Sequence, residues 1–428
     1  MRTFNIKTFG CKVNQSDSEK INQLMIEAGL ILVNAFDVDI FIINSCTVTK
    51  KASSQSKRLI KKIKQNNLKT KIVVTGCFVE DPSNEIFKIQ DIDFIIKNKE
   101  KFSILKKLKN INDKKIKKNN KYNSLTNRIR PIIKVQDGCE SFCSYCIIPY
   151  TRGKIKSVYE KKIFENIKFF DKNNYKEFIL TGINLGEYGK DFNPKRKLYK
   201  LLYNITKKKY NSIKQVRISS IEPLNLSNKI IELIKNNKKK NINICEHFHI
   251  PLQSGDNNIL RKMKRKYSTE YFFELINKIL DNIPKACIGL DLIVGFPGET
   301  EKSFQKTYNF INNLKISYLH VFPFSPRKGT LAWDFNNNIK INKIKYRAKV
   351  MRKLSIKKRK IFLKKFLNQD FSVLVESRVH NEINKLKGLT KNYIPIYFNS
   401  KKNLCNTFQN IKIIKINENG IAQGILNN

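Results

Sequence analysis

Short apolar segments alternate with helix-compatible stretches through the first hundred residues of the chain. Three of these segments are predicted strands, at residues 4–8, 40–43 and 72–75. After the first strand, Ser16 and Glu19 form the S-x-x-E pattern of a capping box, and apolar residues then recur at helical spacing. Strands that alternate with helices usually pair in parallel and carry helices on both faces of the sheet. We therefore predict an N-terminal α/β domain with a parallel sheet over residues 1–112.

The alternation of strand and helix resumes in the middle of the chain. Predicted strands begin at Ile132 and then follow at residues 178–181, 216–219, 248–252, 288–294 and 319–324. This pattern predicts a partial (β/α) barrel over residues 125–356, whose ligands should gather at the carboxyl ends of the strands. Residues 113–127 are polar and rich in lysine, so they are predicted to be a linker.

The pattern changes again near the C-terminus. After a basic helical stretch at residues 342–366, short strands are predicted at residues 371–376, 393–398 and 411–416, with Gly and Asn between them. Short strands without intervening helices predict a small β-barrel over residues 360–428. The expected fold class is therefore α/β with a small all-β domain at the end.

The charge of the chain favours a nucleic-acid partner without requiring one. The 428 residues include 84 Lys and Arg against 35 Asp and Glu, which gives a net charge of +49. Phosphates attract such a protein through counterion release. A genome rich in A and T would also raise the content of Lys, Asn and Ile without selection for binding. The sequence contains no run of eighteen apolar residues and no secretory signal, so we expect a cytoplasmic protein that does not span a membrane.

Nine cysteines without an export signal are more often metal ligands than disulfides. Cys139, Cys143 and Cys146 lie in the segment DGCESFCSYCIIPYTRG, spaced C-x3-C-x2-C. A structural zinc site needs four ligands, and no fourth Cys or His lies nearby. A zinc site with a distant ligand, or three reduced cysteines without metal, are the alternatives. The loop, with Tyr145 before its third cysteine, resembles the signature of the radical S-adenosylmethionine (SAM) enzymes. The resemblance implies a 4Fe–4S cluster whose open iron chelates SAM.

Three further cysteines follow the predicted N-terminal strands. Cys11, Cys46 and Cys77 are expected at the carboxyl edge of the parallel sheet, where open α/β sheets bind ligands. Because cysteine is often buried, they could instead be core residues. The phrases TFGCKVNQSDSE, INSCTVT, TGC, HIPLQSG, RKMKRKY and IVGFPGETE resemble the methylthiotransferases. This resemblance implies a second 4Fe–4S cluster on these three cysteines. Relatives often have Tyr-Ala-Gln after the third cysteine, where this chain has Phe-Val-Glu.

Other residues at predicted strand ends are candidates for binding SAM. The ordered set of motifs matches a radical SAM core, and it includes two glycine-rich turns that allow close backbone approach. The candidates are Tyr145, Gly182, Gly186, Ser219, Glu222, His249, Gln253 and Gly295. Each motif is weak alone, since a glycine after a strand is usually only a turn. Among the four histidines, His249 is the candidate for a role near the cofactor, and a structural role is expected for His247 and His320.

The phrases KTFGCKVN, TGINLGEYG, RISSIEP and HVFPFSPRKGT resemble the branch that acts on N6-threonylcarbamoyladenosine beside the tRNA anticodon. Leu331 departs from this branch, whose members usually have Pro there. The resemblance implies that two SAM molecules and two 4Fe–4S clusters convert C2–H into C2–SCH3. It also implies an electron donor such as flavodoxin or ferredoxin, a sulfur source, and a TRAM-like RNA-binding barrel at the C-terminus. The alternatives are N6-isopentenyladenosine in tRNA or a ribosomal protein as substrate, and a non-enzymatic Fe–S or zinc RNA-binding protein.

Overall fold

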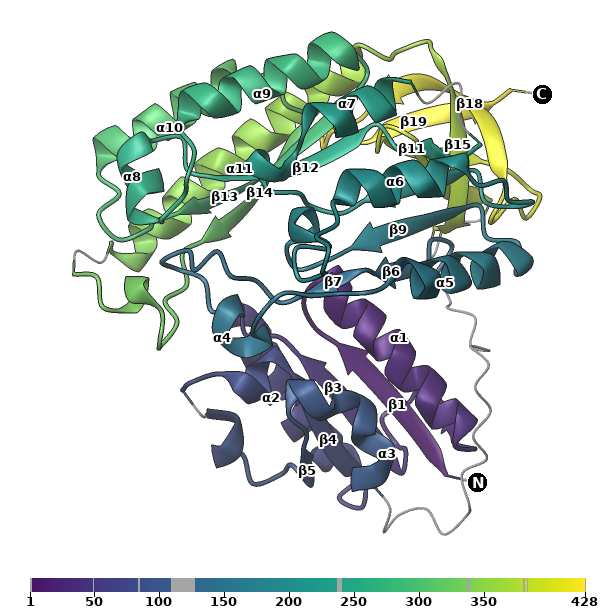
Figure 1. The fold of residues 1–428 in the computed structure, drawn as a ribbon, viewed down its shortest axis with the longest axis vertical. Coiled ribbons are helices and arrows are strands. Elements are labelled where there is room, and N and C mark those ends of the chain that lie inside the picture. The colour runs from purple at the N-terminus through teal and green to yellow at the C-terminus, as the bar shows by residue number, and fades with distance from the viewer. Residues whose placement is uncertain are drawn as a thin grey trace. The chain divides into compact units, whose positions relative to one another are not determined.

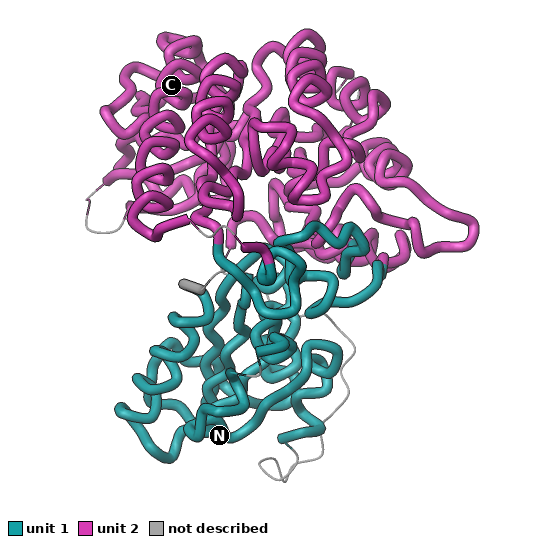
Figure 2. The backbone as a smooth tube through the Cα atoms, turned by 90° about the vertical axis from the view of Figure 1, so that its left-hand side faces the viewer, with its two compact units in different colours: residues 1–127, 136–156, 325–334 teal, residues 128–135, 157–324, 335–428 magenta. Residues whose placement is uncertain are grey.

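The computed structural model describes residues 2–48, 50–83, 85–108, 128–236, 241–336, 339–379, 382 and 384–427. The predicted linker at residues 113–127 lies outside the described residues. The chain forms two compact units (Figure 2). The first contains residues 1–127, 136–156 and 325–334, and the second contains residues 128–135, 157–324 and 335–428. The unit boundaries differ from the three predicted domains, because the segment with Cys139, Cys143 and Cys146 belongs to the first unit.

A parallel sheet forms the centre of the first unit, in the strand order β2-β1-β3-β4-β5 (Figure 1). The strands are β1 (Thr3–Thr8), β2 (Ile31–Leu32), β3 (Ile40–Ser45), β4 (Lys71–Gly76) and β5 (Phe94–Ile95). The helices are α1 (Lys12–Glu27), α2 (Lys50–Asn66), α3 (Ile104–Lys107) and α4 (Ile148–Arg152), and 3-10 turns cover Cys77–Glu80, Glu85–Lys88 and Asn98–Ser103.

Both faces of this sheet are apolar, which explains the continuous hydrophobic run of β3. Successive side chains of a strand point to opposite faces. Ile42 therefore packs on one face with Ile21 and Met25 of α1. Phe41 packs on the other face with Ile60 of α2. The predicted parallel α/β domain is confirmed.

The second unit contains two parallel sheets, β11-β10-β9-β6 and β12-β13-β14, with helices between successive strands except between β11 and β12. The strands are β6 (Ile132–Lys134), β9 (Glu177–Thr181), β10 (Gln215–Ile218), β11 (Asn243–Ile244), β12 (His247–Gln253), β13 (Cys287–Val294) and β14 (Tyr318–Pro323). The helices are α5 (Glu160–Lys172), α6 (Leu198–Lys207), α7 (Asn228–Lys235), α8 (Asn257–Lys262), α9 (Thr269–Asn282), α10 (Glu301–Asn313) and α11 (Ile341–Lys364). One continuous apolar core joins both sheets to α5, α6, α7, α9, α10 and α11, as the alternation of strands and helices predicts. Two short strands, β7 (Gln136–Asp137) and β8 (Lys156–Ser157), pair separately.

The C-terminal segment forms a closed five-stranded barrel in the order β15-β16-β17-β19-β18. Its strands are β15 (Asp370–Arg378), β16 (Lys385–Thr390), β17 (Pro395–Asn399), β18 (Phe408–Ile416) and β19 (Ala422–Leu426). The barrel belongs to the second unit, where Arg217 donates hydrogen bonds to the carbonyl oxygens of Thr390 at 3.1 Å and Lys391 at 3.3 Å. The predicted small β-barrel is confirmed. None of the described helices is both long enough and apolar enough to cross a membrane.

Candidate functional site: two sets of three cysteines

The first set of cysteines lies at the carboxyl edge of the N-terminal sheet. Cys11 is the N-cap of α1 just beyond β1, Cys46 follows β3, and Cys77 follows β4. The three strands are consecutive in the sheet and parallel, so their carboxyl ends lie side by side. The edge that the sequence predicts for these cysteines is therefore the edge on which the structure has them.

Two glycines allow the backbone to come close to these cysteines. Gly10 has a φ of +98°, and a Cβ atom built on it would lie 2.8 Å from the Sγ atom of Cys46. Gly76 has a φ of +94°, and its Cβ atom would lie 2.4 Å from the carbonyl oxygen of Ser45. Both backbone conformations are strained for any other residue type, and both spaces are too small for a side chain. Gly10 and Gly76 therefore let the loops of the three cysteines pack against one another.

The electrostatics of this edge favour neutral thiols in the absence of a metal. Burial is the main reason that the pKa of Cys46 is raised to about 12, and the neighbouring Cys77 and Cys11 thiols contribute because their charges repel a thiolate. Metal-bound thiols are deprotonated, so a metal centre would supply the positive charge that three neighbouring thiolates need. Cysteine thiolates are the usual ligands of 4Fe–4S clusters, and the donor set fits such a group. Within the described ranges, no group of three or more His, Cys, Asp or Glu side chains is already arranged to hold a metal ion.

The second set lies on the loop between β7 and α4, within the same compact unit. Cys139, Cys143 and Cys146 are all partly exposed. The amide of Cys146 donates a hydrogen bond to the carbonyl of Cys143 at 3.0 Å, which closes a tight turn between two of them. Gly138 lets the start of the loop pack closely against the backbone of Lys154. A Cβ atom built on Gly138 would lie 2.0 Å from the carbonyl oxygen of Lys154, so no other residue type fits there. Both sets of three cysteines therefore belong to one compact unit.

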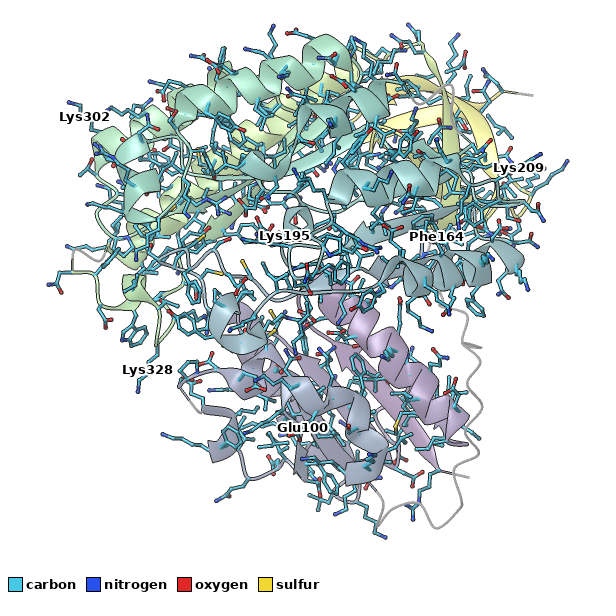
Figure 3. The ribbon with its side chains drawn as sticks, in the orientation of Figure 1. Glu100, Phe164, Lys195, Lys209, Lys302 and Lys328 are labelled. Carbon is cyan, nitrogen blue, oxygen red and sulfur yellow. The ribbon has the colours of Figure 1, made fainter. Side chains whose placement is uncertain are left out.

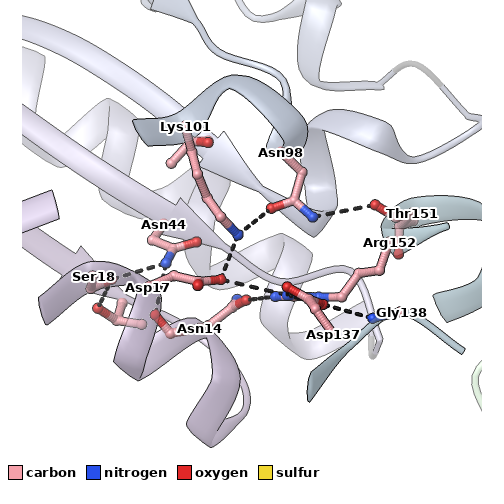
Figure 4. Close-up of polar contacts among 12 residues, drawn as sticks. Asn14, Asp17, Ser18, Asn44, Asn98, Lys101, Asp137, Gly138, Thr151 and Arg152 are labelled. Atoms are coloured by element: carbon pink, nitrogen blue, oxygen red, sulfur yellow. Dashed lines mark hydrogen bonds and ion pairs between the residues drawn. The ribbon is translucent and has the colours of Figure 1, made fainter. Parts of the chain in front are cut away.

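A buried polar network connects the loop of the second set to the sheet of the first (Figure 4). Arg152, at the end of α4, has a fully buried side chain. Its guanidinium donates to both carboxylate oxygens of Asp137, at 2.9 and 3.0 Å, and to the side-chain oxygen of Asn14 on α1. Asp17 lies 3.5 Å from the same guanidinium and is also paired with Lys101. The network contains two cations and two carboxylates, so its buried charges balance.

The positive charge of Arg152 also interacts with cysteines of the first set. The charges of Cys77, Asp137, Asp17 and Cys11 offset the desolvation of the guanidinium and raise the pKa of Arg152 well above its ordinary value. The side chain therefore stays protonated at every accessible pH. Arg152 was not identified from the sequence as a site residue, although it ends the motif that contains the three cysteines.

The remaining candidate residues, apart from Tyr145 on the cysteine loop and His249 within β12, lie in the second unit at the carboxyl ends of strands. Gly182 and Gly186 follow β9, Ser219 and Glu222 follow β10, Gln253 ends β12, and Gly295 follows β13. Gly186 packs against Asn225, since its Cβ atom would lie 2.2 Å from the Asn225 Cβ. The amide of Gly295 donates to the Glu299 carboxylate at 2.8 Å, and Glu222 is paired with Arg265. Their positions match the expected cofactor edge, and their role in binding SAM stays a prediction.

His249 belongs to a chain of side chains across β12, β13 and β14. Its Nε2 atom lies 2.8 Å from a carboxylate oxygen of Asp291, and its Nδ1 atom lies 3.2 Å from the hydroxyl of Tyr318. The same hydroxyl lies 2.8 Å from Nε2 of His247, and the ring of His320 contacts His249 edge-on at 5.1 Å. Sequence reasoning missed Asp291 and Tyr318 as partners, because the contacts depend on the register between neighbouring strands.

Two family models match separate parts of the chain, and the curated relatives match more than nine-tenths of it. The description "Radical SAM superfamily" matches residues 133–311, and "Uncharacterized protein family UPF0004" matches residues 3–97. The threonylcarbamoyladenosine tRNA methylthiotransferase MtaB of Aquifex aeolicus is 36% identical over 91% of this chain and 95% of its own length. MtaB of Bacillus subtilis is 33% identical over 97% of this chain and 94% of its own length. A tRNA-2-methylthio-N(6)-dimethylallyladenosine synthase of Clostridium botulinum is 32% identical over 97% of this chain and 95% of its own length.

Among solved structures, the radical SAM methyltransferase TsrM of Kitasatospora setae shares the fold. It aligns with a TM-score of 0.53 at 11% identity, over 75% of this chain and 73% of its own length. This likeness agrees with the parallel strands and helices of the second unit. With curated relatives at 33 to 36% identity over more than nine-tenths of the chain, the protein belongs to the family of radical SAM tRNA methylthiotransferases.

Proposed function

We propose that this enzyme converts the C2–H bond of N6-threonylcarbamoyladenosine, next to the tRNA anticodon, into C2–SCH3. In this proposal Cys139, Cys143 and Cys146 hold one 4Fe–4S cluster, and Cys11, Cys46 and Cys77 hold a second one. The observation that carries the proposal is the presence of two separate sets of three cysteines in one compact unit, in a chain whose curated relatives are named for this nucleoside. When bound, the two clusters and two SAM molecules supply the radical, the sulfur and the methyl group.

The residues of the chain have separate tasks in this scheme. The three cysteines of the C-x3-C-x2-C loop would hold one cluster, which would supply the chemistry of SAM cleavage. The three strand-end cysteines bind the cluster that presents sulfur. Arg152 holds the two cysteine segments together through Asn14 and Asp137, and its buried charge offsets the negative charge of cysteine thiolates. The glycine-rich strand ends of the second unit, at Gly182 and Gly295, bind SAM.

The choice of nucleoside is supported by the names of the relatives and by the motifs of the chain. Threonylcarbamoyladenosine is named for relatives at 33 and 36% identity, and dimethylallyladenosine for one at 32%. These identities lie close together, so N6-isopentenyladenosine is the second candidate. The enzyme would need an electron donor such as flavodoxin or ferredoxin and a sulfur source, both of which the cytoplasm provides.

Mass spectrometry of tRNA nucleosides tests the substrate. We expect tRNA from cells that express the protein to contain 2-methylthio-N6-threonylcarbamoyladenosine. Transfer RNA from cells without the protein should contain only N6-threonylcarbamoyladenosine, which lacks the methylthio group. An active-site control is the Cys143→Ala variant, which should behave like the deletion. Appearance of only 2-methylthio-N6-isopentenyladenosine would move the enzyme to the second branch. Unchanged tRNA with a methylthiolated ribosomal protein would overturn the tRNA assignment.

The C-terminal barrel is the proposed RNA-binding element. Three of its lysines are exposed, at Lys401, Lys402 and Lys415. Truncation near Phe366 would be a poor test, because Phe366 is buried in a core that also contains Tyr318 and Cys287 of the parallel strands. Replacement of the three exposed lysines by Glu tests the same idea without exposing that core.

The matched control changes the same number of charges elsewhere on the second unit. Exposed lysines point outward from many elements, as Lys209 and Lys302 do in Figure 3. Three exposed lysines of α5 serve as the control, at Lys161, Lys168 and Lys172. If the barrel binds RNA, its triple Glu variant should weaken tRNA binding more than the α5 variant does. Equal weakening by both variants would indicate attraction by net charge alone.

A further inference from the structure

Arg327 is a buried cation with unused hydrogen-bond donors. It lies in the segment of residues 325–334, which belongs to the first compact unit together with both cysteine sets. The side chain is only 11% exposed. Its Nε and Nη2 atoms are buried and have no hydrogen-bond partner among the residues that the structure describes. A buried guanidinium with two unpaired donors is costly, so such donors usually face an acceptor that is not part of the chain.

Arg327 is linked through Asp81 to the residue that follows Cys46. Its Nη1 atom lies 4.0 Å from a carboxylate oxygen of Asp81. Asp81 in turn accepts a buried hydrogen bond from the hydroxyl of Thr47, the residue after Cys46. Burial lowers the pKa of Arg327, and the charges of Asp81, Cys46 and Glu85 oppose that effect. Arg327 therefore lies close to the segment that contains Cys46.

Backbone contacts hold the turn that carries Arg327 in place. The carbonyl of Arg327 accepts hydrogen bonds from the amide of Thr330 at 3.1 Å and from its hydroxyl at 2.7 Å. Gly329, with a φ of +83°, lets this turn approach Pro82, because its Cβ atom would lie 3.2 Å from the proline ring. The amide of Ala332 donates to the carbonyl of Ser144 at 2.7 Å, inside the C-x3-C-x2-C loop. One short segment therefore contacts the loops of both cysteine sets.

We propose that Arg327 binds the sulfur that the enzyme transfers, as a small sulfur anion such as sulfide or methanethiolate, at the Cys46 side of the strand-edge cysteines. The inference rests on the proposed function, since it requires a cluster on Cys11, Cys46 and Cys77. A guanidinium presents its N–H groups as a planar fork, and hydrogen bonds from it to an anion are charge-assisted. The sulfur anion would accept hydrogen bonds from the two unpaired donors. Sulfide held there would be the nucleophile that takes a methyl group from SAM, and methanethiolate would be the product of that step. Asp81 keeps the guanidinium oriented from its other side.

Methanethiolate binding to the reconstituted protein tests the proposal without an activity assay. The experiment uses the Cys143→Ala background, so that only the cluster on the strand-edge cysteines contributes to the electron paramagnetic resonance spectrum. Methanethiolate is titrated until the spectral change saturates, which gives an apparent Kd. We expect Arg327→Met to raise this Kd by about tenfold or more, because it removes a charge-assisted hydrogen-bond donor. Arg327→Lys keeps the positive charge but lacks the planar fork of N–H groups. Its Kd should therefore lie between that of the protein with Arg327 and that of Arg327→Met.

The neighbouring Lys328 provides a matched control. Its side chain is exposed and carries the same charge (Figure 3), so Lys328→Met should leave the Kd unchanged. Thermal melting compares the folding of all variants, and Arg327→Lys retains a readout if Arg327→Met is unstable. An unchanged Kd in both Arg327 variants would overturn the role of Arg327 and leave the proposed function intact. A Cys143→Ala protein that binds no cluster iron would instead contradict the two-cluster function, and the inference with it.

Discussion

Replacement of Arg152 by Met should destabilise the first compact unit by about 3 kcal/mol. Removing one partner of a buried ion pair typically costs about 3–5 kcal/mol, because the other charge stays buried. The lower end applies here for two reasons. Asp17 keeps its pairing with Lys101, and the Asp137 side chain is 24% exposed, so water can hydrate it. The side-chain oxygen of Asn14 also loses its hydrogen-bond donor. This loss adds to the destabilisation, so the expected change in the free energy of unfolding stays at about 3 kcal/mol.

Hydrogen–deuterium exchange measures this effect in the unit concerned. The slowest amides of α1 exchange through opening of the unit, so a loss of about 3 kcal/mol should speed them by roughly a hundredfold. Arg152→Lys keeps the charge and loses the fork, and it should have a smaller effect, about 1–2 kcal/mol. The control is Lys154→Met, an exposed lysine two residues further along the chain, which should change nothing. Exchange in Arg152→Met equal to that of Lys154→Met would refute the structural role of the network.

Three further predictions address cofactor content, RNA binding and pH. The anaerobically reconstituted protein should contain about eight iron atoms and eight sulfides, and a fully active preparation with half that content would contradict two clusters. Binding of tRNA should weaken steeply with salt concentration, and the barrel triple Glu variant should show a shallower dependence on salt than the wild type. The pKa of Glu270 is lowered from its ordinary value of 4.5 to about 2, chiefly by a hydrogen bond with Ser268. The charged side chain therefore stabilises α9 fully when the pH is above 4.5. This contribution should disappear as the pH falls from 4.5 toward 2, and Glu270→Gln should remove that part of the acid sensitivity in melting curves.

The parallel strands could be predicted because their sequences are short and apolar. β3 and β4 are buried on both faces of the sheet, so each contains a continuous apolar run, at residues 40–43 and 72–74. The barrel strands β16 and β19 were missed. Their sequences, KLKGLT and AQGIL, contain lysines, a glutamine and glycines, because a barrel strand buries only one face. The overall architecture follows from periodicity, whereas strands with one solvent face need their neighbours to be identified.

The cysteine edge could also be predicted, because residues that follow neighbouring parallel strands meet at one edge of a sheet. The polar network behind it could not. Asn14 and Arg152 are separated by 138 positions in the sequence, and no local pattern pairs them. The unpaired donors of Arg327 are likewise a property of packing and not of the SPRKGT motif in which it lies. Sequence patterns therefore identify the cysteines, while the residues that supply charge around them require the structure.

The assay that tests the central claim most directly compares two cysteine variants and measures two products of each. Cys143→Ala removes a ligand of the SAM-binding set, so it should form neither 5′-deoxyadenosine nor the methylthiolated nucleoside. Cys46→Ala damages only the strand-edge set, so the folded and reconstituted variant should still cleave SAM to 5′-deoxyadenosine while it makes no methylthiolated nucleoside. If Cys46, which is 6% exposed, were only a core residue, the cavity would cost about 1–3 kcal/mol and lower both products together. A Cys46→Ala protein that melts near the wild-type temperature and still methylthiolates tRNA fully would contradict the assignment of separate functions to the two cysteine sets.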